Sequence, residues 1–151
     1  MMKRFYLAEL NMARALYPLE DPRMAEFVAN LDAINGLAER SPGFIWRLVN
    51  INGSTTTVRL FDDPLLLVNL SVWETVDALF DYVYRSQHLE FWKRRHEWFS
   101  HDERSGTVMW WIPADQLPTL EEAVVRLEQL QRIGPTVEAF TFKQRFAAPQ
   151  L

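Results

Sequence analysis

The stretch that decides the fold is residues 65–99, which read LLLVNLSVWETVDALFDYVYRSQHLEFWKRRHEWF. Its first nine residues are apolar on both alternating sides, which predicts a strand buried on both faces of a sheet. From Thr75 onward apolar residues recur three and four apart, so a helix is expected, with a break near Ser86 and a second segment ending near Phe99. Three of the six Trp and two of the three His lie here, so this stretch holds most side chains suited to chemistry.

Helices and strands alternate on both sides of this stretch. Asp21 suits the N-cap of a helix over 22–40, and a capping box at Thr119 opens a further helix that ends near residue 133. Residues 52–53 are Asn-Gly, a strong signal for a turn between two strands. Besides the strand over 65–73, strands are predicted over 5–12, 44–49, 55–61, 107–112 and 139–146.

The order of these elements predicts one α+β domain over 1–151. Strands that alternate with helices, with a hairpin in the middle, are typical of a ferredoxin-like antiparallel sheet with its helices on one face. A sheet that is apolar on its second face needs cover there as well. A second copy of the chain is the economical cover, so we expect a homodimer.

Composition excludes several classes of protein. The chain has 151 residues, no Cys and a net charge of −4, so disulfides, thiolate metal sites and a Cys nucleophile are excluded, and nothing attracts nucleic acid globally. The basic run at 93–95 stands beside Glu90 and Glu97, which indicates a salt-bridged helix face. No run approaches the roughly 20 apolar residues of a membrane span, and the start lacks the pattern of a signal peptide. We therefore expect a cytoplasmic location.

The candidate pocket begins with three aromatic side chains spaced by four. Tyr84, His88 and Trp92 share one face if the helix is continuous there. His88 is either a structural residue bonded to the backbone, a general acid or base, or an axial ligand to haem. Two His eight residues apart, without a third ligand at a recognisable spacing, make a poor zinc site, so no metal is predicted.

Sheet positions are expected to complete the same space. Asn69 and Ser71, on one side of a very apolar strand, could bond to the backbone at a bulge or to a dimer partner, or they could orient a ligand carbonyl or stabilise an oxyanion. Arg47 could pair with Glu9 across strands or face the acid or phenolate group of a ligand. Indoles offer a flat apolar wall that suits a planar aromatic compound, or they belong to the core and an interface. The predicted catalytic residues are His88, Tyr84 and Asn69; the predicted substrate-binding residues are Trp46, Arg47, Ser71, Trp73, Trp92 and Trp110.

Several motifs resemble those of one family. The segments SPGFIWRL (41–48), FDDPLLLVNLSVWE (61–74), YRSQHLEFWKRRHEWF (84–99) and WWIPA (110–114) resemble the DUF3291 family. That family is similar to the dimeric α/β-barrel superfamily, which includes the antibiotic-biosynthesis monooxygenases. The resemblance implies a ferredoxin-like fold and a dimer formed by apposed sheets. It says little about activity, because the superfamily also holds haem binders, dehydratases, isomerases and ligand-sensing domains.

Three functions stay open at this point. The first is an enzyme resembling cofactor-independent monooxygenases, in which an apolar cavity holds an aromatic substrate, His88 or Tyr84 handles a proton, and Asn69 or Arg47 stabilises the anion. The second is a non-catalytic binder of a small apolar molecule. The third is a haem protein that uses His88.

Overall fold

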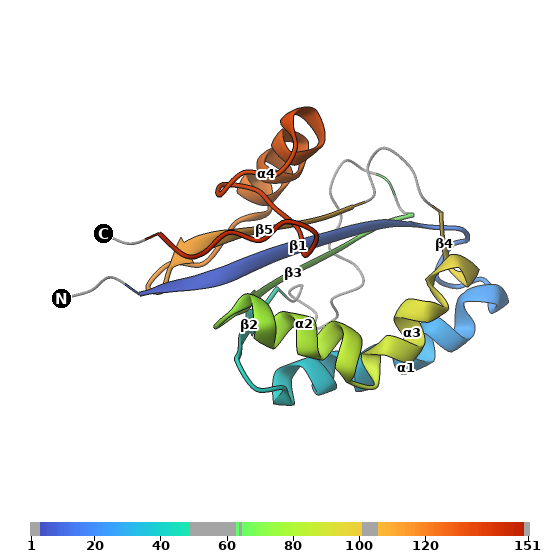
Figure 1. The fold of residues 1–151 in the computed structure, drawn as a ribbon. Helices are drawn as coiled ribbons and strands as arrows, with labels where there is room; N and C mark the ends of the chain where they lie inside the picture. The colour runs from blue at the N-terminus through green and yellow to red at the C-terminus, as the bar shows by residue number, and fades with distance from the viewer. Residues whose placement is uncertain (1–3, 49–62, 64, 101–105, 150–151) are drawn as a thin grey trace.

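The computed structural model describes residues 4–48, 63, 65–100 and 106–149 (Figure 1). The predicted strand over 55–61 and the turn at 52–53 lie outside these residues. The chain runs through β1 (Phe5–Ala15), η1 (Pro22–Met24), α1 (Ala25–Arg40), β2 (Phe44–Arg47), β3 (Leu66–Trp73), α2 (Val76–Arg85), α3 (His88–Lys93), η3 (Arg95–Glu97), β4 (Phe99–Ser100), β5 (Gly106–Pro113) and α4 (Leu120–Ile133).

The strands form one antiparallel sheet with β1 near its centre. The order is β2-β3-β1, with β5 along the other side of β1 and the short β4 beside its last two residues. Because β3 is antiparallel to both β1 and β2, those two run in the same direction, and α1 connects them across β3. In the same way α2 and α3 connect β3 to β5 across β1. Two interlocked split βαβ units define a ferredoxin-like sheet, so the predicted α+β class is confirmed.

The two faces of the sheet have different partners (Figure 1). Side chains such as Leu7 and Trp73 pack against α1, α2 and the segment after α4, whereas Leu10 and Trp110 belong to a second core that includes α4. The expected placement of helices on one face therefore holds for α1, α2 and α3 but not for α4. Its apolar stripe, centred on Ala123 and Leu127, covers part of the face for which a second copy was expected, so the homodimer stays a prediction.

The helical region after β3 is interrupted where the sequence predicted a break. Thr75 caps α2 by accepting a hydrogen bond from the backbone of Ala78, and Asp77 stands in the first turn. The helix ends at Arg85, Ser86 is extended, and α3 starts at His88. The interruption lets α3 and η3 follow the sheet toward the far end of β1. Together α2 and α3 therefore cover a long part of one sheet face.

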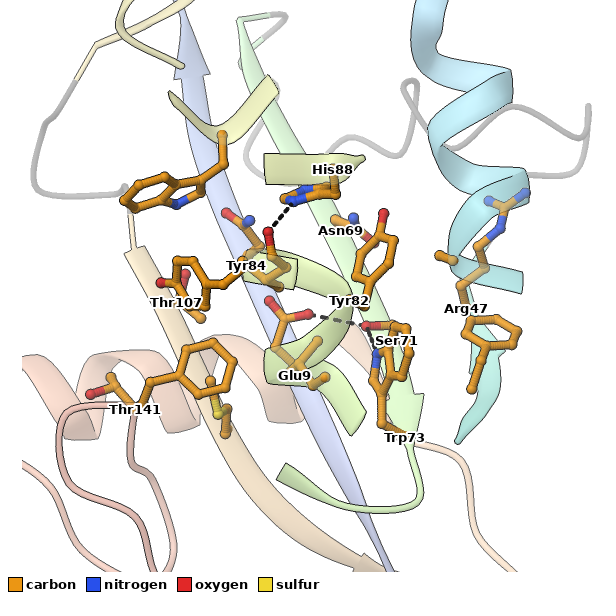
Figure 2. A pocket seen from close by; sticks show the side chains of 18 of the residues that line it. Glu9, Arg47, Asn69, Ser71, Trp73, Tyr82, Tyr84, His88, Thr107 and Thr141 are labelled. Atoms are coloured by element: carbon orange, nitrogen blue, oxygen red, sulfur yellow. Dashed lines mark hydrogen bonds between the residues drawn. The ribbon is translucent and has the colours of Figure 1, made fainter. Parts of the chain in front are cut away.

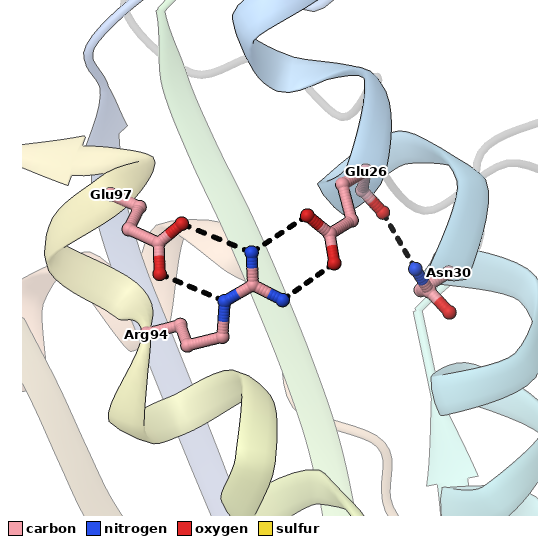
Figure 3. A network of polar contacts seen from close by, with 4 residues as sticks. All are labelled: Glu26, Asn30, Arg94 and Glu97. Atoms are coloured by element: carbon pink, nitrogen blue, oxygen red, sulfur yellow. Dashed lines mark hydrogen bonds and ion pairs between the residues drawn. The ribbon is translucent and has the colours of Figure 1, made fainter.

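A charged network connects the end of α3 and η3 to α1. The guanidinium of Arg94 donates two hydrogen bonds to Glu26 (2.6 and 2.7 Å) and two to Glu97 (2.8 and 3.0 Å), as Figure 3 shows. Asn30 donates from its side chain to the carbonyl of Glu26, one turn earlier in α1. These bonds hold the pKa of both carboxyls below their usual range. Of the basic run, Arg94 thus pairs with Glu97, as expected, and with Glu26 of α1 as well.

The last part of the chain differs from the prediction. A strand was expected over 139–146, but only Phe140 pairs with β5, through two backbone hydrogen bonds with Met109 (2.8 and 2.9 Å). The chain then turns, because Gln144 bonds back to Thr141, and the predicted strand is therefore wrong. Within the described residues no helix has both the length and the apolar character needed to cross a membrane.

Candidate functional site

A cleft lies between the sheet and the helical layer formed by α1, α2 and α3. Its inner part has a volume of about 330 Å³ and reaches Glu9, and its outer part has a volume of about 730 Å³ and extends toward β4. Both parts are within the size range of small-molecule sites. The inner and outer parts are continuous, because seven residues line both of them: Asn11, Asn35, Asn69, Tyr82, His88, Trp92 and Thr107.

Polar side chains form the floor of this cleft because strand register brings them into rows. Asn11 of β1 is opposite Asn69 of β3 on one side and opposite Thr107 of β5 on the other. Two residues earlier in β1, Glu9 is opposite Ser71. Residues two apart in a strand share a face, so both rows point into the cleft. The floor is thus a polar patch beside the apolar core residues of the same face, such as Leu7 and Trp73.

Glu9 is the most unusual residue of the floor. Only 7% of it is exposed, and its Oε2 accepts a hydrogen bond from Ser71 Oγ (3.0 Å), which in turn accepts one from Trp73 Nε1 (3.0 Å), as Figure 2 shows. No residue in the described part of the chain donates to Oε1. Burial raises the pKa of Glu9 to about 7, against the lowering effect of the Ser71 bond. Near neutral pH the carboxyl can therefore release or accept a proton.

His88 stands at the junction of α2 and α3 above this floor (Figure 2). Its Nδ1 lies 3.1 Å from the carbonyl oxygen of Val83, so Nδ1 carries the proton and Nε2 has the free lone pair. Burial lowers the pKa of His88, although the bond to Val83 opposes this effect. The imidazole is neutral at pH 7 and can accept a hydrogen bond. The backbone bond expected of a structural histidine is present, and the side chain lines the cleft as well.

Aromatic rings make up the walls. Tyr82 is stacked on Trp73, with ring centroids 5.2 Å apart, and also contacts His88 at 4.8 Å. Tyr84 meets Trp92 edge-on at 5.3 Å. Burial and the nearby charge of Glu9 raise the pKa of Tyr82, so its hydroxyl stays protonated. These flat walls suit a planar apolar compound.

Arg47 reaches the cleft from β2, in the same row as Ser71 and Glu9. Its predicted ion pair with Glu9 does not form, because β3 lies between the two strands. The guanidinium instead has Glu39 of α1 beside it, with Nε 3.3 Å from Oε2. Nε and Nη1 are buried and make no hydrogen bond.

The structure brings together seven of the nine residues predicted for the site. His88, Tyr84, Asn69, Arg47, Ser71, Trp73 and Trp92 all line the inner cleft. Asn69 is exposed and not buried as expected, because it lies where the inner and outer parts of the cleft meet. Whether any of these residues acts on a ligand stays a prediction.

Two predicted residues lie elsewhere. Trp110 is opposite Ala8 and Trp46 is opposite Val72, so the alternation of strand residues directs both toward the α4 side of the sheet. Trp110 is fully buried there, and its Nε1 donates to Glu122 (2.7 Å). The expectation that these two indoles share the cleft is corrected.

Sequence reasoning missed Glu9 as a site residue. It was considered only as a partner for Arg47, although an acid flanked by Ala8 and Leu10 in a central strand is itself a signal. The neighbours that desolvate it come from β3 and the helices, far away in the sequence. No group of three or more His, Asp or Glu among the described residues could hold a metal ion.

Comparison with known proteins identifies a family. The model of the family described as "Domain of unknown function (DUF3291)" matches residues 6–151, so the chain belongs to that family, as its motifs indicated. No curated protein matches the chain.

Two solved structures are similar at low identity. One is SnoaB, a cofactor-independent oxygenase from Streptomyces nogalater, with 17% identity, a TM-score of 0.49, and coverage of 74% of this chain and 95% of that one. The other is an asparagine-to-alanine mutant of SnoaB, with 16% identity, a TM-score of 0.48 and the same coverage.

Proposed function

We propose that this DUF3291 protein binds a small, planar, largely apolar compound in the cleft and transfers a proton to or from it through Glu9. The observation that carries the proposal is the buried carboxyl at the polar floor of an aromatic-walled cleft, with Oε1 unpartnered among the described residues. A buried carboxyl whose pKa is near 7 has the property that general acid–base catalysis at neutral pH requires.

The neighbours of Glu9 have complementary roles. Ser71 occupies Oε2 and, with the Trp73 indole behind it, holds the carboxyl in one orientation, which leaves Oε1 as the atom that exchanges the proton. The side-chain amides of Asn11 and Asn69 lie in the next row of the floor. They can donate hydrogen bonds to the anion that forms when the ligand loses its proton.

His88 offers a second hydrogen-bond acceptor, on the helical side of the cleft. Because the N–H at Nδ1 donates to the carbonyl of Val83, Nε2 can accept a hydrogen bond from a hydroxyl group of the ligand. A compound held between Glu9 and His88 would have its ring against Tyr84 and Trp92. In cofactor-independent monooxygenases, the substrate loses a proton to form an electron-rich anion, and this anion reacts with molecular oxygen. We extend the proposal to that reaction class, with Glu9 as the group that removes the proton.

Hydrogen–deuterium exchange of an enolisable aromatic ketone tests proton transfer directly. β-Tetralone is small and largely planar, and its exchange in D₂O is followed by proton NMR. The carboxylate of Glu9 takes a proton from the carbon next to the carbonyl, the enolate forms, and a deuteron returns from the exchanged carboxyl. The wild type should exceed the buffer rate by at least about 100-fold, the contribution typical of a positioned acid or base.

Two variants separate catalysis from binding. Glu9→Gln should reduce exchange to the buffer rate while β-tetralone still quenches Trp fluorescence, and Glu128→Gln, at an exposed position of α4, should behave as the wild type. Binding without exchange by the wild type would leave the non-catalytic binder as the function. Absence of both would overturn the proposal. A haem role for His88 stays a prediction, which the absorption spectrum of protein incubated with hemin tests.

A further inference from the structure

The guanidinium of Arg47 has buried N–H groups that make no hydrogen bond within the protein. Its side chain is 14% exposed, and Nε and Nη1 are both buried without a hydrogen bond. The carboxyl of Glu39 is 3.3 Å from Nε but lies on a half-exposed side chain, so this ion pair leaves the directed donors unsatisfied. Buried polar groups are nearly always hydrogen-bonded, because leaving a donor without a partner is unfavourable. An exception in the wall of a cleft needs an explanation.

We propose that Arg47 binds the carboxylate group of the ligand, so that the natural ligand is a planar aromatic acid. This inference rests on the proposed function of the cleft and adds the class of compound. A guanidinium presents its N–H groups in a planar fork that matches the two oxygens of a carboxylate. A carboxylate bound end-on to Nη1 and Nη2 would satisfy Nη1, which the folded protein leaves without a hydrogen bond, while Glu39 stays beside Nε.

The charges around the cleft favour a single carboxylate over a more highly charged group. Among the described residues that line the inner cleft, Arg47 is the cation whose donor atoms are buried, since His88 is neutral and Lys143 is exposed. Burying a charge is favourable only when it is paired. Arg47 already has the half-exposed carboxylate of Glu39 beside it, so a single further negative charge is favoured over a phosphate dianion, which would leave a larger excess of negative charge near Glu9.

The position of Arg47 also orients the ligand. Arg47 and Glu9 occupy one row of the sheet with Ser71 between them, so their Cα atoms are separated by two strand spacings, roughly 10 Å. The charges of both act on Tyr82, in opposite directions. An acid held by Arg47 would therefore direct its far end toward Glu9, with its ring against the aromatic walls of the cleft.

A matched pair of neutral and charged probes tests the inference. Titration calorimetry with 2-naphthoate and 2-naphthamide compares the same ring with and without the charge. Wild type should bind the acid roughly 10- to 100-fold more tightly than the amide, the factor expected for hydrogen bonds to a charged group. Arg47→Met should abolish this preference and still bind the amide, and Arg47→Lys should retain only part of it.

Controls separate a binding role from a structural one. Arg85→Met, at an exposed position of α2, should keep the preference of the wild type. Arg47→Met should also unfold at a urea midpoint no lower than that of the wild type, because it removes buried N–H groups that lack hydrogen bonds and an ion pair with a half-exposed carboxylate that contributes little. A lower midpoint would assign Arg47 to the structure and overturn the inference.

The outcomes distinguish this inference from the proposed function. Equal binding of both probes by the wild type, or an acid preference that survives in Arg47→Met, would overturn the aromatic acid and leave the cleft as a binding site. If the wild type bound neither probe but catalysed exchange of β-tetralone, the inference would fail and the proposed function would stand. Loss of all three signals would overturn both.

Discussion

Replacing Glu9 with Gln should make the stability of the protein less dependent on pH. The folded state raises the pKa of this carboxyl from 4.5 to about 7, so it binds the proton more tightly than the unfolded chain does. The stabilisation is fully present below pH 4.5 and is lost as the pH rises through about 7. With about 1.4 kcal/mol for each pKa unit, the loss amounts to about 3 kcal/mol. Glutamine has no charge to bury, so the loss should vanish in the variant.

Urea unfolding across this pH range measures the effect. The free energy of unfolding of Glu9→Gln minus that of the wild type should grow by about 3 kcal/mol between about pH 4.5 and about pH 8, which corresponds to roughly 6–12 °C in Tm for a domain of this size. The Gln amide oxygen can still accept the bond from Ser71, and any penalty of its NH₂ group is the same at every pH. Glu128→Gln is the matched control and should show no such growth.

A constant difference between Glu9→Gln and the wild type would refute the reasoning. It would mean that the carboxyl titrates as an ordinary solvated glutamate, which would remove the base from the proposed function. A difference that shrinks as the pH rises would mean that the carboxylate is the favoured form in the folded protein. Arg47 would then have to approach Glu9 more closely than the structure shows.

Three further predictions follow from local contacts. Ser71→Ala removes the bond that lowers the pKa of Glu9, so the fall in stability should move above about pH 7, as read from the same urea series. Gly43 has a φ of 83°, and a Cβ there would lie 2.5 Å from a side-chain carbon of α2. Gly43→Ala should therefore lower the free energy of unfolding by about 2–4 kcal/mol, as measured by urea unfolding, whereas Gly36→Ala inside α1 should not lower it. Arg94→Ala should lower the thermal midpoint in low salt, and about 1 M NaCl should largely remove the difference from the wild type, since the network is exposed; an undiminished difference would contradict this account.

The positions of the elements could be predicted because their signals are local. The alternation over 65–73, the caps at Asp21 and Thr119 and the break at Ser86 all depend on residues within a few positions, and the structure contains each of them. The strand expected over 139–146 failed because its pairing depends on β5. Only Phe140 meets that strand before the chain turns.

The distribution of helices between the two faces needed the tertiary structure. The apolar stripe of α4 shows that the helix must pack on something, but it does not say which face of the sheet receives it. The same limit applies to Trp46 and Trp110. Their residue type suits a ligand wall, yet strand register places them on the α4 side.

By itself the sequence determined the order of the elements, the split βαβ arrangement and most of the cleft residues, because periodicity, caps and family motifs are written in neighbouring positions. Only the tertiary structure decided that Glu9 is buried with one oxygen open and that Arg47 lacks hydrogen bonds. The physical reason is that desolvation and hydrogen bonding depend on groups from separate strands and helices. Those groups meet only when β1, β2 and β3 pair beneath α1 and α2.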